Sequence, residues 1–197
     1  MPGRTCVSLA TICLFSFVPA LHAQETVVNL DPGRTKIAFT LGATMHTVEG
    51  TFKLKTAQIR FDPANGKASG TIVVDAMSGD SENKGRDKKM NAEVLESEKY
   101  REIIFTPNHV QGTLAPEGNS QMQVAGVFRL HGQDHEMTLT LNVHVSAGNE
   151  LQANAHFSVP YAQWGLKNPS TWLLHVNDSV DVDVHATGHL SSESTHH

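Results

Sequence analysis

Histidine is the residue type in this sequence that could do the most chemistry, because twelve histidines are present and a neutral imidazole binds metal ions well. His144, His156 and His185 occupy the polar face of predicted strands, where they would cluster if those strands were neighbours. However, no His-x-His pair occurs, and Asp181 and Asp183 are the only carboxylates near them in the pattern. We therefore predict no metal site.

Motifs for catalysis are missing from the sequence. It contains no Gly-x-Ser-x-Gly, no His-Glu-x-x-His and no glycine-rich phosphate loop. Asp181 and Asp183 lie two residues apart on one strand, on its solvent face, where water keeps both ionised. The sequence therefore favours a binding protein over an enzyme and predicts no cofactor for catalysis.

The balance of charges restricts the partners. The formal net charge is −5, and loss of Arg4 with a cleaved leader would bring it to −6. Nucleic-acid binding relies on clustered Lys and Arg, so it is excluded. The net negative charge also opposes electrostatic binding to anionic lipids, so any contact with a membrane is expected to be transient.

The N-terminus is typical of a secretory signal peptide. Arg4 precedes an uncharged, mostly apolar run from Cys6 to Val18, and Leu21-His22-Ala23 supplies a small residue for cleavage. The run is shorter than the roughly 20 residues of a membrane span. We expect a signal peptide at residues 1–23, one domain at 24–190 and a disordered tail at 191–197, in a periplasmic or secreted protein. Both cysteines lie in the leader, so no disulfide supports the fold.

Apolar and polar residues alternate through most of the remaining chain. Met137, Leu139, Leu141 and further alternate residues to Val145 are apolar, and the residues between them are polar. This period of two predicts antiparallel strands with one buried face. Turn residues at 62–66, 115–119 and 147–149 separate the strands and favour up-and-down pairing. About eight such strands would form either a barrel or a sandwich.

One segment, Ser81–Tyr100, breaks this alternation. It is rich in Glu, Lys, Asp and Asn, and Met90, Val94 and Leu95 follow helical spacing. We predict one or two short helices packed over one end of the sheet structure. Asp87 would either start a helix or pair with Arg86 at the mouth of the barrel, and we favour the helix start.

The apolar face holds the candidate ligand-binding residues. All six phenylalanines after the leader take inward positions. A filled core is one interpretation; a cavity is the other, because inward residues such as Val143, Ala153 and Ala155 are small and Met122 and Met137 are adaptable. The predicted ligand-binding residues are Phe39, Leu41, His46, Phe52, Phe61, Phe105, Met122, Phe128, Leu141, Phe157, Trp164 and Trp172.

Ordered landmarks from about Asp31 to Leu190 resemble the YceI-like family of exported lipid- and polyisoprenoid-binding proteins. They are Met45-His46 with Val48–Phe52, Ile59–Pro63, Arg86-Asp87, Tyr100–Phe105, Val124–Gly126 with Leu130–Gly132, Phe157–Tyr161, Trp164–Lys167 and Pro169-Ser170. The chain departs from the family pattern at Arg101, where proline is usual, and at Lys88-Lys89-Met90.

This resemblance implies an all-β fold, an eight-stranded antiparallel, extended lipocalin-like barrel with a short helical insert near one end. It implies an isoprenoid quinone, a polyprenyl lipid or another long-chain lipid as the bound ligand. His46 would bind a head group or fix a loop, and Trp164 and Trp172 would gate the ligand or pack the rim. The alternatives are a barrel enzyme acting on a small apolar substrate and a structural or stress protein with a filled barrel. The sequence also leaves a homodimer open, through a strand edge or the helical insert.

Overall fold

Antiparallel β-strands form most of the computed structural model, which describes residues 24–44, 46–172 and 174–194. Within these residues one sheet contains nine strands. Their bounds are β1 (Gln24–Leu30), β2 (Lys36–Gly42), β3 (Thr47–Phe61), β4 (Ala68–Asp80), β5 (Glu102–Gln111), β6 (Gly118–Leu130), β7 (Gln133–Ser146), β8 (Glu150–Val159) and β9 (Val180–Ser194).

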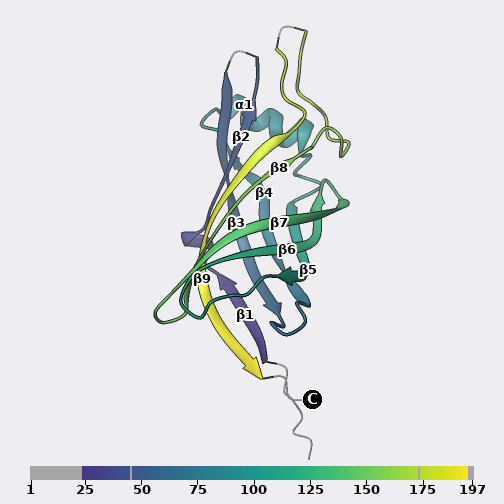
Figure 1. The fold of residues 1–197 in the computed structure, drawn as a ribbon. Helices are drawn as coiled ribbons and strands as arrows, with labels where there is room; N and C mark the ends of the chain where they lie inside the picture. The colour runs from purple at the N-terminus through teal and green to yellow at the C-terminus, as the bar shows by residue number, and fades with distance from the viewer. Residues whose placement is uncertain (1–23, 45, 173, 195–197) are drawn as a thin grey trace, which may run out of the picture.

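The sheet closes into a barrel. From β2 to β9, each strand pairs antiparallel with the next in the chain, and β2 also pairs with β9, so eight strands form a ring (Figure 1). The predicted fold class and the up-and-down pairing are confirmed. Closure leaves no whole strand of the described residues at an open edge.

The ninth strand, β1, shares a place in the ring with β2. β2 pairs with residues 47–52 of β3, whereas β1 pairs with residues 58–61 of the same strand. A single 3₁₀ turn, η1 (Pro32–Arg34), separates β1 from β2. Alternation did not reveal β1, because the adjacent residues Val27 and Val28 are both buried.

The end of the chain differs from the prediction. β9 continues to Ser194, and its residues 191–194 pair with residues 24–27 of β1. The predicted disordered tail from residue 191 is therefore wrong for these four positions, while 195–197 lie outside the described residues. Backbone hydrogen bonds hold these residues in the strand. Because residues 191–194 are all polar, the sequence shows no alternation of apolar and polar residues there.

The helical insert is confirmed at one end of the barrel. It consists of α1 (Lys84–Lys89), which continues directly as a π-helical turn, η2 (Met90–Val94). The helix start differs from the prediction, because Asn83 is the N-cap and its side chain accepts a hydrogen bond from the backbone N–H of Arg86. No helix among the described residues has the length and apolar character needed to cross a bilayer.

Gly188 makes the crossing of β1, β9 and β8 possible. It pairs with Leu30 on one side and Leu151 on the other. A Cβ atom at this position would lie 2.3 Å from the carbonyl oxygen of Asn29, which is far inside contact distance. The three strands can approach closely only because residue 188 has no side chain.

We expect Gly188→Ala to lower the free energy of unfolding by about 2 kcal/mol, because β1 must move away from β9 to admit the methyl group. Urea unfolding would measure this. Gly33→Ala is the control, since its Cβ would meet nothing closer than 3.4 Å, and it should change stability by less than about 0.5 kcal/mol. Equal effects of the two substitutions would contradict the packing argument.

Candidate ligand-binding site

The barrel interior contains a partly open cavity of about 320 Å³. This volume lies within the range of roughly 300–1,000 Å³ typical of ligand pockets. Every strand contributes to the lining, and almost all of the exposed lining surface is carbon. The interior is therefore not a completely filled core.

Nine of the twelve predicted binding residues line this cavity. They are Phe39, Leu41, Phe52, Phe61, Phe105, Met122, Phe128, Leu141 and Phe157. They come from six strands, β2, β3, β5, β6, β7 and β8. Alternation therefore identified the inward face of these strands correctly.

The other three predicted residues are not part of the lining. His46 is exposed in the connection between β2 and β3. Trp164 is half-buried outside the lining, and its ring stacks on His135 with centroids 3.9 Å apart. Trp172 is 91% exposed. Neither tryptophan lines the ligand space, as an aromatic gate would. Trp164 packs behind the lining, with its ring centroid 5.8 Å from that of Phe128.

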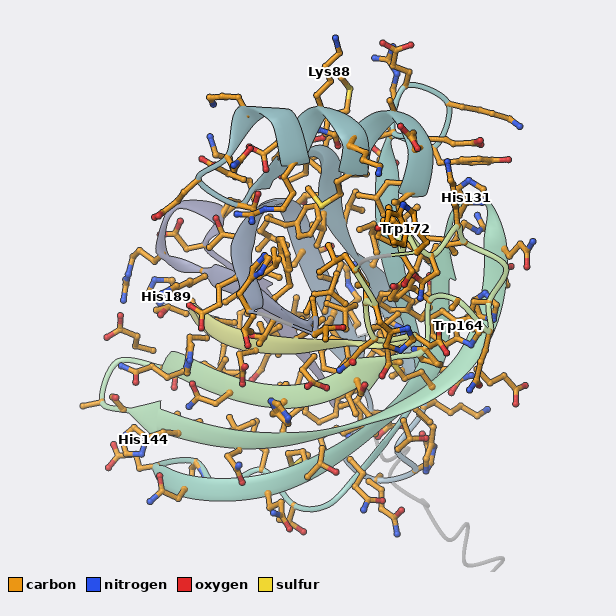
Figure 2. The ribbon with its side chains drawn as sticks, turned by 90° about the horizontal axis from the view of Figure 1, so that it is seen from above. Lys88, His131, His144, Trp164, Trp172 and His189 are labelled. Carbon is orange, nitrogen blue, oxygen red and sulfur yellow. The ribbon has the colours of Figure 1, made fainter. Side chains whose placement is uncertain are left out.

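Several lining residues were not predicted as part of the site. Met90, Val94 and Leu95 project from the helical insert, and Leu166 and Pro169 come from the segment 160–179 between β8 and β9. The helical spacing of the first three was visible in the sequence, but their direction depends on how the insert lies against the barrel. Figure 2 shows Lys88 pointing away from the barrel at its outer edge.

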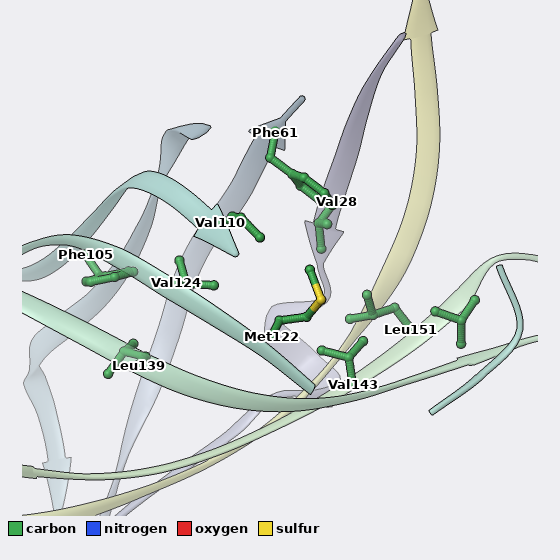
Figure 3. Close-up of a cluster of buried hydrophobic side chains, with 10 residues drawn as sticks. Val28, Phe61, Phe105, Val110, Met122, Val124, Leu139, Val143 and Leu151 are labelled. Carbon is green, nitrogen blue, oxygen red and sulfur yellow. The ribbon is translucent and has the colours of Figure 1, made fainter. Parts of the chain in front are cut away.

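The cavity is elongated. On β6 the lining extends from Met122 to Leu130, which spans about 26 Å at roughly 3.3 Å per residue. Strands in a barrel tilt by about 40°, so this corresponds to about 20 Å along the barrel axis. Figure 3 shows one part of the interior, where Val28, Phe61 and Met122 approach each other from three different strands. A long, narrow space of this kind suits a chain better than a compact ring.

Small side chains keep part of this space open. Val143 on β7 and Ala153 and Ala155 on β8 all line the cavity. Large rings line other parts of the cavity, including the pair Phe39 and Phe52, whose ring centroids are 5.4 Å apart. The sequence argument that small inward residues leave room is consistent with this arrangement.

Only two lining residues among those described carry a side-chain oxygen, Thr35 and Tyr161. The Tyr161 hydroxyl donates a 2.6 Å hydrogen bond to the carbonyl oxygen of Asn177, and burial raises the pKa of Tyr161 to about 12. It therefore stays neutral near pH 7. The Thr35 hydroxyl is buried and has no hydrogen-bond partner. The cavity thus contains no charge and no acid–base group suited to neutral pH.

The histidines considered as metal ligands lie on the outer surface, and each forms a hydrogen bond with a different residue. His144 contacts Asn119 at 2.8 Å, and His185 contacts Asn154 at 2.6 Å. His156 contacts the carboxylate of Asp183 at 2.8 Å. Within the described part of the chain, no group of three or more His, Cys, Asp or Glu side chains could hold a metal ion.

A buried polar network fixes the insert at the barrel end. The Asp87 carboxylate accepts hydrogen bonds from the backbone N–H and the hydroxyl of Ser81, at 2.9 and 2.5 Å. The Arg86 guanidinium donates to the same Ser81 hydroxyl at 2.8 Å. The hydrogen bonds from Ser81 lower the pKa of Asp87, with Lys84 and Arg86 contributing. A 2.6 Å ion pair between Lys167 and Glu93 joins the segment 160–179 to η2.

Comparison with protein families and relatives gives a consistent assignment. The profile described as the YceI-like domain matches residues 29–188. A UPF0312 protein of Vibrio cholerae is 24% identical over 189 residues, which cover 94% of this chain and 97% of that protein.

Solved structures share the fold at low sequence identity. BcnA of Burkholderia cenocepacia has a TM-score of 0.66 at 18% identity, covering 80% of this chain and 98% of its own. A polyisoprenoid binding domain from Saccharophagus degradans has a TM-score of 0.61 at 16% identity, covering 86% and 99%. The YCEI protein of Campylobacter jejuni has a TM-score of 0.60 at 17% identity, covering 77% and 88%.

Thr35→Val should stabilise the protein by about 1 kcal/mol, because it replaces a buried, unpaired hydroxyl with a methyl group of the same size. Urea unfolding of the ligand-free protein would measure the change. Thr140→Val, on the exposed face of β7, serves as the control and should alter stability by less than about 0.5 kcal/mol. A loss of stability in Thr35→Val would show that the hydroxyl does have a partner.

Asp87→Asn should reduce stability at neutral pH and have little effect in acid. The pKa of Asp87 is lowered in the folded protein, so its carboxylate stabilises the fold above the unfolded-state pKa of about 4. That contribution is lost as the pH falls through the folded-state pKa. The difference in urea midpoint between wild type and variant should therefore shrink from pH 7 towards pH 3. A gap that stays constant with pH would refute the assignment.

Proposed function

The chain belongs to the YceI-like domain family, and we propose that it is an exported carrier or storage protein that holds a long apolar ligand inside its barrel. The observation that carries this proposal is the elongated cavity, which is lined by carbon and contains no charged side chain. An isoprenoid quinone, a polyprenyl lipid or a similar long-chain lipid matches this chemistry.

The hydrophobic effect alone can supply the affinity. Each methylene removed from water contributes about 0.8 kcal/mol, so burying about a dozen would contribute roughly 10 kcal/mol. The loss of translational and conformational freedom on binding reduces this figure. A chain that buries more methylenes gains more, so a long lipid can exceed this cost without a specific head-group contact. The Saccharophagus degradans relative of similar fold is described as a polyisoprenoid binding domain, which favours an isoprenoid chain among the candidate lipids.

Binding explains the interior better than catalysis or a filled core. An enzyme acting on a small apolar substrate would need a nucleophile or an acid–base pair facing the cavity. The lining offers only the hydroxyls of Thr35 and Tyr161, and the second is engaged with Asn177. A structural protein with a filled barrel has no need of the space beside Ala153 and Ala155.

Export rests on the N-terminal leader. Residues 1–23 lie outside the described residues, and β1 begins at Gln24. Cleavage after Ala23 would therefore leave all nine strands of the described residues in place. We propose a periplasmic or secreted location, where a water-insoluble lipid needs a carrier.

Organic extraction of the purified protein, followed by mass spectrometry, tests the function. We expect about one long-chain lipid per protein molecule. The protein mass should correspond to a chain that begins at Gln24. Ala155→Phe should reduce the lipid roughly tenfold, because the added ring occupies the ligand space. Circular dichroism would confirm that the variant keeps its β-sheet.

Gln152→Phe is the matched control, since residue 152 lies on the same strand but on its exposed face. It should retain the lipid of the wild type. An empty extract, together with no thermal shift on adding an isoprenoid quinone or a polyprenol, would overturn the proposed function. Equal lipid in both phenylalanine variants would show that the ligand lies elsewhere.

A further inference from the structure

Two segments project side by side at the end of the barrel that carries the helical insert. One is the connection from β2 to β3, and the other is the middle of the segment 160–179 (Figure 1). The backbone N–H of Thr44 donates to the carbonyl oxygen of His175 at 2.9 Å, and that of Asn177 donates to Gly42 at 2.9 Å. A β-bridge joins Ala43 to Val176. We call residues 42–44, 46, 170–172 and 174–176 the mouth tip.

Trp172 is the most exposed large apolar side chain among the described residues. It is 91% exposed, and Met77, at 47%, is the only other such residue. The local backbone holds it in this position. The N–H of Thr171 donates to the carbonyl oxygen of Leu174 at 2.8 Å, and the N–H of Leu174 donates to the Thr171 hydroxyl at 3.1 Å. These two hydrogen bonds join Thr171 to Leu174, and the indole of Trp172 lies in solvent.

The mouth tip also carries no formal charge. Residues 40–48 and 168–177 contain no Asp, Glu, Lys or Arg, although charged residues make up 18% of the chain. Trp164, in the same segment, is half-buried against His135 and so packs on the barrel instead. An uncharged protrusion with an exposed indole is costly to keep in water but suits the boundary between lipid head groups and hydrocarbon.

The mouth tip adjoins residues of the cavity lining along the chain. Leu166 and Pro169 line the cavity, and Pro169 precedes Trp172 by only three residues in the same segment. A bilayer in contact with Trp172 would therefore lie next to one end of the cavity lining. A lipid could pass between the two with little of its chain exposed to water.

We propose that the mouth tip docks on a lipid bilayer by inserting Trp172 among the head groups, and that the docked barrel exchanges its ligand there. This inference rests on the proposed function and names its membrane step. Because the tip is uncharged and the chain has a net charge of −5, the attraction is apolar. Docking should therefore occur on zwitterionic lipid and should not weaken as salt is raised.

Flotation of the purified protein with phosphatidylcholine vesicles tests the proposal. We expect the wild type to float with the vesicles at low and at high salt. Its tryptophan emission should shift to the blue and be quenched by brominated phosphatidylcholine. Trp172→Ala should reduce partitioning at least tenfold, since roughly half of a 150–250 Å² indole surface no longer leaves water. It should slow transfer of an isoprenoid quinone from vesicle to barrel by a similar factor.

Met77→Ala is the matched control, because it removes the other exposed apolar side chain and lies on β4 outside the mouth tip. It should bind vesicles and take up quinone as the wild type does. Trp172→Ala should still contain the lipid loaded in the cell, which would show that its barrel is intact.

The outcomes separate this proposal from the proposed function. Wild-type protein that contains lipid but does not float, or Trp172→Ala that floats equally well, would overturn membrane docking and point to a protein partner for loading. Vesicle binding that depends on Trp172, in a protein that yields no lipid and shows no thermal shift with an isoprenoid quinone or a polyprenol, would support docking and overturn the lipid-carrier function.

Discussion

Hydrogen bonding between β3 and β4 closes the sheet into a ring, and the apolar interior depends on that closure. In an open sheet, the inward phenylalanines would need a second layer to cover them. In a ring, the inner faces of opposite strands cover one another. The number of strands sets the width of the barrel. The wall therefore cannot move inward to fill the space that small residues such as Ala153 and Ala155 leave. The cavity is thus a geometric consequence of closure combined with side-chain size.

The irregular segments give the two ends of the barrel different roles. At one end, β1 and the last residues of β9 pair and extend the wall. At the other, the helical insert is held by the buried Ser81–Asp87 contact and is tied to the segment 160–179 by the pair of Glu93 and Lys167. These polar contacts lie outside the ligand space. The insert can therefore contribute Met90 and Val94 to the lining without introducing a charge there.

Separation of polar and apolar chemistry extends over the whole molecule. Several histidines of the strands lie on the outer surface and bond to polar neighbours there, such as His156 to Asp183 and His185 to Asn154. The interior has one satisfied hydroxyl, that of Tyr161, and one unpaired hydroxyl, that of Thr35. Such an interior offers a ligand apolar surface and almost no hydrogen-bonding group.

The sequence by itself determined the strands, their inward faces and the nature of the lining, because a side-chain period of two is a local property of each strand. It placed residues such as Phe39, Phe105 and Met122 correctly on the cavity wall. It did not reveal β1, whose pairing with β9 joins the first and last described strands, nor the strand residues 191–194. Closure, the space left inside, and the outward positions of His46 and Trp172 were decided only by tertiary structure. Each depends on contacts between segments far apart in the chain, which no local pattern encodes.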